Sequence, residues 1–143
     1  MNKVKGGYFH KLLKVDLSSK IWEVEPLSDD FISKYIGGRG FGAKWVWDNL
    51  KAHNFKINPL GEENLLVMAP GPFTGLYLPS SGKMSFISIS PATGIYGDSS
   101  MGGVFGVEFR QTGFDALSLK GKPRNFLFFS LMMAMFPLSQ LRN

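Results

Sequence analysis

The chain has 143 residues, of which 44% are hydrophobic and 19% are charged, and its formal net charge is +5. A chain of this length and composition can bury a core of its own, which excludes a largely disordered protein. It contains no cysteine, so disulfides, thiolate-bound zinc, iron–sulfur ligation and a cysteine nucleophile are excluded within these residues.

The first elements in chain order are a predicted β-hairpin. Apolar and polar residues alternate within residues 8–17, and residues 21–25 form a second extended run. The polar residues 18–20 between them are typical of a turn. The pattern therefore predicts two neighbouring antiparallel strands.

Two helices are predicted next. Ser28 is a good N-cap, and Asp29 and Asp30 place negative charge in the first turn of a short helix that ends at Gly37. After a run of glycines, apolar residues at helical spacing predict a second helix over residues 43–50.

Three further strands are predicted in the second half of the chain, at residues 64–69, 84–90 and 116–120. Residues 97–106 between the last two are rich in glycine and are interpreted as a loop. Strands among glycine-rich turns, with a few helices, predict one α+β domain built on a mixed sheet.

The first candidate binding site is the glycine-rich run at residues 37–44, with the sequence GGRGFGAK. Glycines let the backbone turn tightly and expose its N–H groups to an anion, and Arg39 and Lys44 can add positive charge. Neither the P-loop nor the GxGxxG nucleotide motif is present. The alternative interpretation is a junction between two helices that needs the glycines only to bend.

Two more loops are candidates. Ser99, Ser100, Met101, Gly102 and Gly103 combine hydroxyl groups with a backbone that a ligand can approach closely, which suits phosphate or magnesium. The alternative is an ordinary loop. A second loop ends in Lys83, which can present one cation to a ligand, although a lysine beside a strand edge is the commoner case.

No catalytic residue is predicted. His10 and His53 have no carboxylate or serine partner at a diagnostic spacing, so we interpret them as solvated or structural. Aromatic residues at alternating or helical spacing are interpreted as core rather than as a stacking surface for bases: Phe31, Tyr35, Trp45, Trp47, Phe73, Phe86, Phe105 and Phe109.

The positive charge is scattered along the chain, which argues against a nucleic-acid partner and is compatible with a phosphate-bearing cofactor. The apolar run at residues 126–138 is shorter than the roughly 20 residues that span a bilayer. Residues 1–7 lack the apolar segment of a secretory signal. A cytoplasmic protein without membrane contact is the expectation.

The order of several motifs is more specific than any one of them. In sequence they read VDLSS, GGRGFGAKWVWDNL, NPLGEENLLVMAPGPFTG, SGKMSFISISPATG and SMGGVFGVEFRQTGFDALSLKGK. This series resembles the N-terminal domain of the tungsten-containing aldehyde ferredoxin oxidoreductase family, nearly continuously from about Tyr8 to Pro123.

The resemblance implies a function. Members of the family oxidise aldehydes to carboxylic acids and pass the electrons through a [4Fe–4S] cluster to ferredoxin. They hold tungsten between two pterins that magnesium bridges through phosphates. The family's N-terminal domain is a duplication of two α+β halves, and this chain matches the first half, which implies a tungstopterin-binding role without the cysteines that ligate the cluster.

The resemblance also implies site residues. It places Gly38, Arg39, Gly40, Lys83, Ser99, Ser100, Gly102 and Gly103 near the cofactor. Lys83 stands where the family commonly has an arginine between cluster and pterin, and keeps only its charge. Ser100 stands where members often have an asparagine near magnesium, which makes it the candidate metal ligand.

The last residues differ from the family pattern. We expect a domain over residues 1–123 and a divergent apolar tail over residues 124–143, as in a truncated gene product that is not active alone. A homodimer or a partner chain would then replace the missing half. The alternatives are a catalytically silent relic that dimerises and a small phosphate-binding module.

Overall fold

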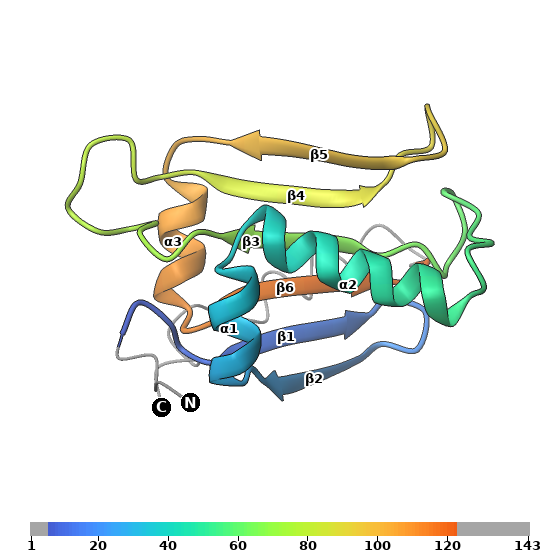
Figure 1. The fold of residues 1–143 in the computed structure, drawn as a ribbon, viewed down its shortest axis with the longest axis horizontal. Helices are drawn as coiled ribbons and strands as arrows, with labels where there is room; N and C mark the ends of the chain where they lie inside the picture. The colour runs from blue at the N-terminus through green and yellow to red at the C-terminus, as the bar shows by residue number, and fades with distance from the viewer. Residues whose placement is uncertain (1–5, 123–143) are drawn as a thin grey trace.

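The computed structural model describes residues 6–122, so the expected tail at 124–143 lies outside the described residues. These residues form one mixed six-stranded sheet and three helices, which confirms the predicted α+β class (Figure 1). The elements are β1 (Lys11–Asp16), β2 (Ile21–Pro26), α1 (Asp29–Tyr35), α2 (Arg39–Ala52), β3 (Leu66–Pro70), β4 (Met84–Ile89), β5 (Tyr96–Met101), α3 (Phe105–Gln111) and β6 (Ala116–Lys120).

The strand order across the sheet is β2-β1-β6-β3-β4-β5. Strands β1 and β6 run parallel, and every other neighbouring pair is antiparallel. The strands β2 and β5 therefore form the two edges of the sheet, at the bottom and top of Figure 1.

Most predicted elements are confirmed. The hairpin, the first helix with Ser28 as its N-cap, and the strands β3, β4 and β6 all form, and the Ser28 hydroxyl accepts a hydrogen bond from the Phe31 N–H at 3.2 Å. The second helix begins at Arg39 rather than near Ala43, because the glycines lie inside its first turns.

The interpretation of residues 97–106 as a loop holds only for residues 102–104 and was wrong for the rest. Residues 96–101 form the edge strand β5, which pairs with β4 along its whole length, and α3 begins at Phe105. Glycine, aspartate and serine have low strand propensity, so pairing with β4 decides the conformation of this segment.

The sheet carries an apolar core on each face. Helices α1 and α2 cover one face, with Phe41, Val46 and Ile87 among the buried residues. On the other face a second cluster includes Met84 and Phe114, with the partly buried Phe109 of α3 packed against it. None of the helices within residues 6–122 combines the length and apolar character that crossing a membrane requires.

An ion pair fixes α3 to the start of the sheet. The Asp115 carboxylate, 1% exposed, accepts hydrogen bonds from the Arg110 guanidinium at 2.7 Å and from the N–H groups of Phe9 and Lys11. Arg110 also donates to the carbonyl oxygen of Gly7 at 2.6 Å. The buried carboxylate therefore has a full set of partners.

We predict that Asp115→Ala lowers the free energy of unfolding by about 3–5 kcal/mol, because it leaves a partly buried guanidinium and two N–H groups without their acceptor. Chemical denaturation measures the change. Lys34→Ala removes the exposed ion pair with Asp30 and should alter the unfolding midpoint little. Equal losses in the two variants would contradict the structural role of Asp115.

Candidate functional site

Most of the predicted site residues gather at one end of the sheet. Pro70 pairs with Met84, and Met84 pairs with Met101, so the end of β3, the start of β4 and the end of β5 lie side by side. We call this the Met84 end of the sheet, at the left of Figure 1. The N–H of Gly38, just before α2, donates to the carbonyl oxygen of Pro70 at 3.0 Å.

A strained turn joins α1 to α2. Ile36 has φ 64° and ψ −50°, and the Gly37 N–H donates to the Tyr35 carbonyl oxygen at 2.7 Å, which defines a γ-turn of the rare, strained form. The Tyr8 hydroxyl donates to the Ile36 carbonyl oxygen at 2.6 Å. The hydrogen bond from Tyr8 thus connects this turn to the N-terminal segment.

Packing explains two of the glycines in α2. A Cβ atom on Gly40 would lie 2.0 Å from the carbonyl oxygen of Tyr35, and one on Gly42 would lie 2.5 Å from the side chain of Ile87. Both glycines therefore let α2 lie close to its neighbours. This observation favours the alternative in which the glycine run shapes a helix junction.

The two predicted serines point to opposite faces of the sheet. Ser100 lies opposite Ser85 of β4, and a Cβ on Gly38 would lie 3.4 Å from the Ser85 hydroxyl oxygen. Ser100 therefore faces the start of α2. Ser99 lies opposite Phe86, on the face that α3 covers.

The loop that carries Lys83 is fixed by Thr74. The buried Thr74 hydroxyl accepts a hydrogen bond from the Gly71 N–H at 3.0 Å and donates to the Lys83 carbonyl oxygen at 2.8 Å. A Cβ on Gly82 would lie 2.4 Å from the carbonyl oxygen of Gly103. The backbone before Lys83 thus lies against the Gly102–Gly103 segment, and the Lys83 side chain is exposed.

Gly102 differs from the other glycines of the site. A Cβ on Gly102 would meet no atom of residues 6–122 within 4 Å, and its backbone conformation is not one reserved for glycine. Gly103 has equally open surroundings, but its φ of 94° favours glycine. Within residues 6–122, packing therefore gives no reason for glycine at position 102. The same holds for Gly71, where a Cβ would make only an ordinary contact with the Thr74 hydroxyl oxygen at 3.8 Å.

Charge at the start of α2 is paired. The Arg39 guanidinium forms an ion pair with Asp98 of β5. Burial raises the pKa of Tyr96, and the Asp98 carboxylate raises it further. Within residues 6–122, no three His, Asp or Glu side chains gather so as to hold a metal ion.

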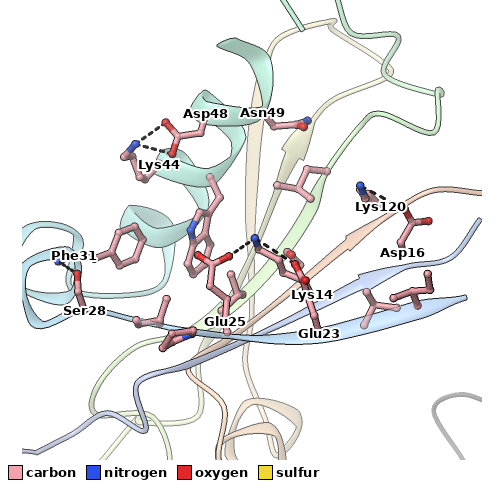
Figure 2. A pocket seen from close by; sticks show the side chains of 18 of the residues that line it. Lys14, Asp16, Glu23, Glu25, Ser28, Phe31, Lys44, Asp48, Asn49 and Lys120 are labelled. Carbon is pink, nitrogen blue, oxygen red and sulfur yellow. Dashed lines mark hydrogen bonds and ion pairs between the residues drawn. The ribbon is translucent and has the colours of Figure 1, made fainter. Parts of the chain in front are cut away.

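A groove with charged walls lies elsewhere. It has a volume of about 700 Å³ and lies between α2 and the strands β1 and β2, and of the predicted site residues only Lys44 lines it (Figure 2). Its charges pair with one another, because Lys14 lies between Glu23 and Glu25, Lys44 bonds Asp48, and Lys120 bonds Asp16. We therefore do not place the site in this groove.

The histidines and the aromatic residues divide between core and surface. The His10 ring nitrogen lies 3.2 Å from the carbonyl oxygen of Leu27, and that of His53 lies 2.8 Å from the carbonyl oxygen of Asn49. Phe31, Phe41 and Trp45 pack together beside α2. Phe86 and Phe109 are partly buried. Trp47, Phe73 and Phe105 are exposed, so the prediction that they lie in the core was wrong.

Sequence reasoning missed three residues of this end: Thr74, Ser85 and Asp98. Ser85 lies one residue after the start of β4 and Asp98 two residues after the start of β5, but the pairing of β4 with β5 is what brings Asp98 beside α2. Thr74 accepts its hydrogen bond from the N–H of Gly71, three residues before it, whereas an ST-turn would bond the N–H two residues further on, so no local turn signal predicts this contact.

The fold resembles that of a solved redox enzyme. A chain of the active-site complex BamBC of benzoyl coenzyme A reductase, solved with 1,5-dienoyl-CoA, aligns at a TM-score of 0.79 and 27% sequence identity, over 85% of this chain and 18% of that chain. The fold is therefore one that also occurs as a domain of a reductase complex.

Two relatives with known activities are similar in sequence to most of this chain. The tungsten-containing aldehyde ferredoxin oxidoreductase of Pyrococcus horikoshii is 39% identical over 116 residues, which cover 81% of this chain and 19% of that protein. The aliphatic sulfonate oxidoreductase, WOR-like subunit, of Pyrococcus furiosus is 42% identical over 121 residues, 83% of this chain and 19% of that protein. This chain thus spans about a fifth of the length of these relatives.

The family model described as aldehyde ferredoxin oxidoreductase, N-terminal domain, matches residues 12–133. The chain therefore belongs to the aldehyde ferredoxin oxidoreductase family and corresponds to its N-terminal domain, as the order of its motifs predicted.

The two kinds of glycine should respond differently to substitution. Gly40→Ala places a Cβ against the Tyr35 carbonyl oxygen, so we expect the free energy of unfolding to fall by about 1–3 kcal/mol. Gly102→Ala meets open space and should stay within about 0.5 kcal/mol of the wild type. Chemical denaturation of both variants measures the two changes in unfolding free energy. Equal decreases in the two variants would contradict the distinction between the two glycines.

The Tyr8 contact should give the fold a dependence on alkaline pH. Burial raises the pKa of Tyr8, and the Asp115 carboxylate raises it further, so the folded state favours the neutral phenol. The associated stability is complete below the unfolded pKa of about 10 and is lost as the pH rises through the folded pKa.

Tyr8→Phe should therefore flatten the fall of the unfolding free energy between pH 9 and pH 11, relative to the wild type. Tyr77→Phe, at a fully exposed ring, is the matched control and should leave the slope unchanged. A slope that Tyr8→Phe does not alter would show that this phenol makes no such contribution.

Proposed function

We propose that this chain supplies the first part of a tungstopterin-binding domain in an enzyme that oxidises aldehydes to carboxylic acids and passes the electrons to ferredoxin. The observation that carries the proposal is the open backbone at Gly102, beside Ser100 and the loop of Lys83. Packing supplies no reason for glycine at position 102, whereas close approach of a ligand does.

The groups at the Met84 end suit a phosphate-bearing pterin. Backbone N–H groups in a glycine-rich turn, a hydroxyl group and a lysine ammonium are all donors that bind phosphate oxygens. Magnesium prefers oxygen ligands and keeps several waters, so it does not require a cluster of carboxylates. We assign an oxygen of Ser100 to the magnesium.

Each of the proposed site residues then has a defined task. Gly102 and Gly103 bring their backbone close to the cofactor, and Lys83 balances negative charge. Gly38 and Gly40 place the start of α2 beside Ser100, with Ser99 anchoring the same strand from the opposite face. Bound tungstopterin supplies the redox centre, and the residues of this chain bind and orient it.

The proposed enzyme needs more than this chain. The sequence has no cysteine to ligate an iron–sulfur cluster, and it spans about a fifth of the length of its relatives. We propose that further polypeptide, in a partner chain or in a longer protein, supplies the cluster and the catalytic groups. One relative is described as a subunit, which supports assembly with other chains.

A second candidate is a catalytically silent homodimer. Large apolar side chains are exposed on the loops of the Met84 end, and such a patch favours association. The exposed residues are Phe73, Leu76, Tyr77, Leu78 and Val104.

We expect protein purified without oxygen from a tungstate-supplied host to contain near-stoichiometric tungsten and pterin. Elemental analysis by mass spectrometry and pterin fluorescence measure both. Gly102→Ala should lower the tungsten content about tenfold or more, which is the usual loss of metal affinity when a residue that supports a metal site is changed. The unfolding free energy should stay unchanged.

Ser19→Ala, at an exposed position in the β1–β2 turn, is the control and should keep the wild-type tungsten content. Wild-type protein with neither tungsten nor pterin, and dimeric by light scattering, would favour the silent homodimer. Full tungsten content in Gly102→Ala would show that the Gly102 backbone does not contact the cofactor.

A further inference from the structure

The starting point is the position of β5 at the edge of the sheet. Within residues 6–122, β5 forms ladder hydrogen bonds with β4 and with no second strand. Helix α2 packs on β3 and β4. The strand that carries Ser99 and Ser100 is therefore held by a strand on one side only, and a direct contact with α2 would restrict its movement away from that helix.

The Arg39–Asp98 ion pair supplies such a contact. Arg39 is the first residue of α2, and its guanidinium Nε bonds the carboxylate Oδ2 of Asp98. Asp98 lies opposite Ile87, the residue that fills the space beside Gly42. The ion pair thus spans from the first turn of the helix to the edge strand.

The face of the strand links this ion pair to the site. Residues two apart on a strand point to the same face, so Asp98 and Ser100 both point toward α2. Ser100 lies opposite Ser85, which in turn lies beneath Gly38. A shift of β5 away from α2 would therefore move Ser100 away from the start of the helix.

The charge of Arg39 is already balanced by Asp98. Of the five N–H donors of the guanidinium, it is the Nε–H that is directed at the Asp98 carboxylate. The side chain of Arg39 is 68% exposed and that of Asp98 is 27% exposed, so the pair lies on the surface at the rim of the site.

We propose that Arg39 is a positioning residue: through its ion pair with Asp98 it holds β5, and with it Ser100, against the start of α2. This inference rests on the proposed function for the role of Ser100, but the positioning itself is a property of the cofactor-free chain. It predicts that the cation at position 39 and the anion at position 98 matter only as a pair.

Hydrogen–deuterium exchange on the full chain tests the positioning without any cofactor. In Asp98→Asn and in Arg39→Gln, the amides of residues 96–101 should exchange about two- to fivefold faster, the size expected for an exposed ion pair. The double variant Arg39→Asp with Asp98→Arg should restore the slower exchange. The amides of β1 and β2 should not change in any variant.

Asp48→Asn is the matched control, because it removes an exposed ion pair with Lys44 on the same helix. It should leave the exchange of β5 at the wild-type rate. Unchanged exchange in Asp98→Asn, or a double variant as fast as the single ones, would overturn the proposal.

Tungsten content separates positioning from direct binding. If Arg39 positions β5, then Asp98→Asn and Arg39→Gln lose equal amounts of tungsten and the double variant regains it, with the unfolding free energy unchanged. If Arg39 binds an anion directly, then Arg39→Gln alone loses tungsten, which contradicts the proposal. Wild-type protein without tungsten would refute the proposed function, and the exchange rates would still decide the positioning.

Discussion

The structure depends on how closely α2 lies against its neighbours. Gly42 faces Ile87 where a Cβ would lie only 2.5 Å from that side chain, and Gly40 faces the Tyr35 carbonyl oxygen at a still shorter separation. Two glycines inside a helix cost on the order of 1 kcal/mol each, and the close packing that they permit offsets this cost. The same contacts fix the start of α2 beside β3 and β4, and hence beside Ser100.

Glycines of the described residues therefore differ in what requires them. Those at positions 40, 42 and 82 are required because another part of the chain occupies the space of a side chain. Gly102 has open space around it within the described residues, so packing there does not require glycine at this position. This difference, rather than the presence of a glycine-rich motif, directs attention to residues 99–103. It also separates the site from the groove with charged walls, where the charged side chains already satisfy one another.

Much of the fold could be predicted from local pattern. Ser28 marks the start of α1, and the alternation around Val15 marks β1, because capping and burial act on neighbouring residues. The strand β5 could not be predicted, since its residues have low strand propensity and only the pairing with β4 orders them. The family resemblance indicated Ser100 and Lys83 as site residues. Nothing in the local sequence indicated Asp98 or Thr74. Their roles arise from contacts between segments that are distant along the chain.

The most direct test of the central claim is the position of tungsten itself. Crystals of protein purified without oxygen from a tungstate-supplied host would be measured at the tungsten absorption edge, and an anomalous difference map would locate the metal. The account predicts a peak at the Met84 end of the sheet, on the side of Ser100 and Gly102. A peak in the groove between α2 and the strands β1 and β2, or at any other surface, would contradict it.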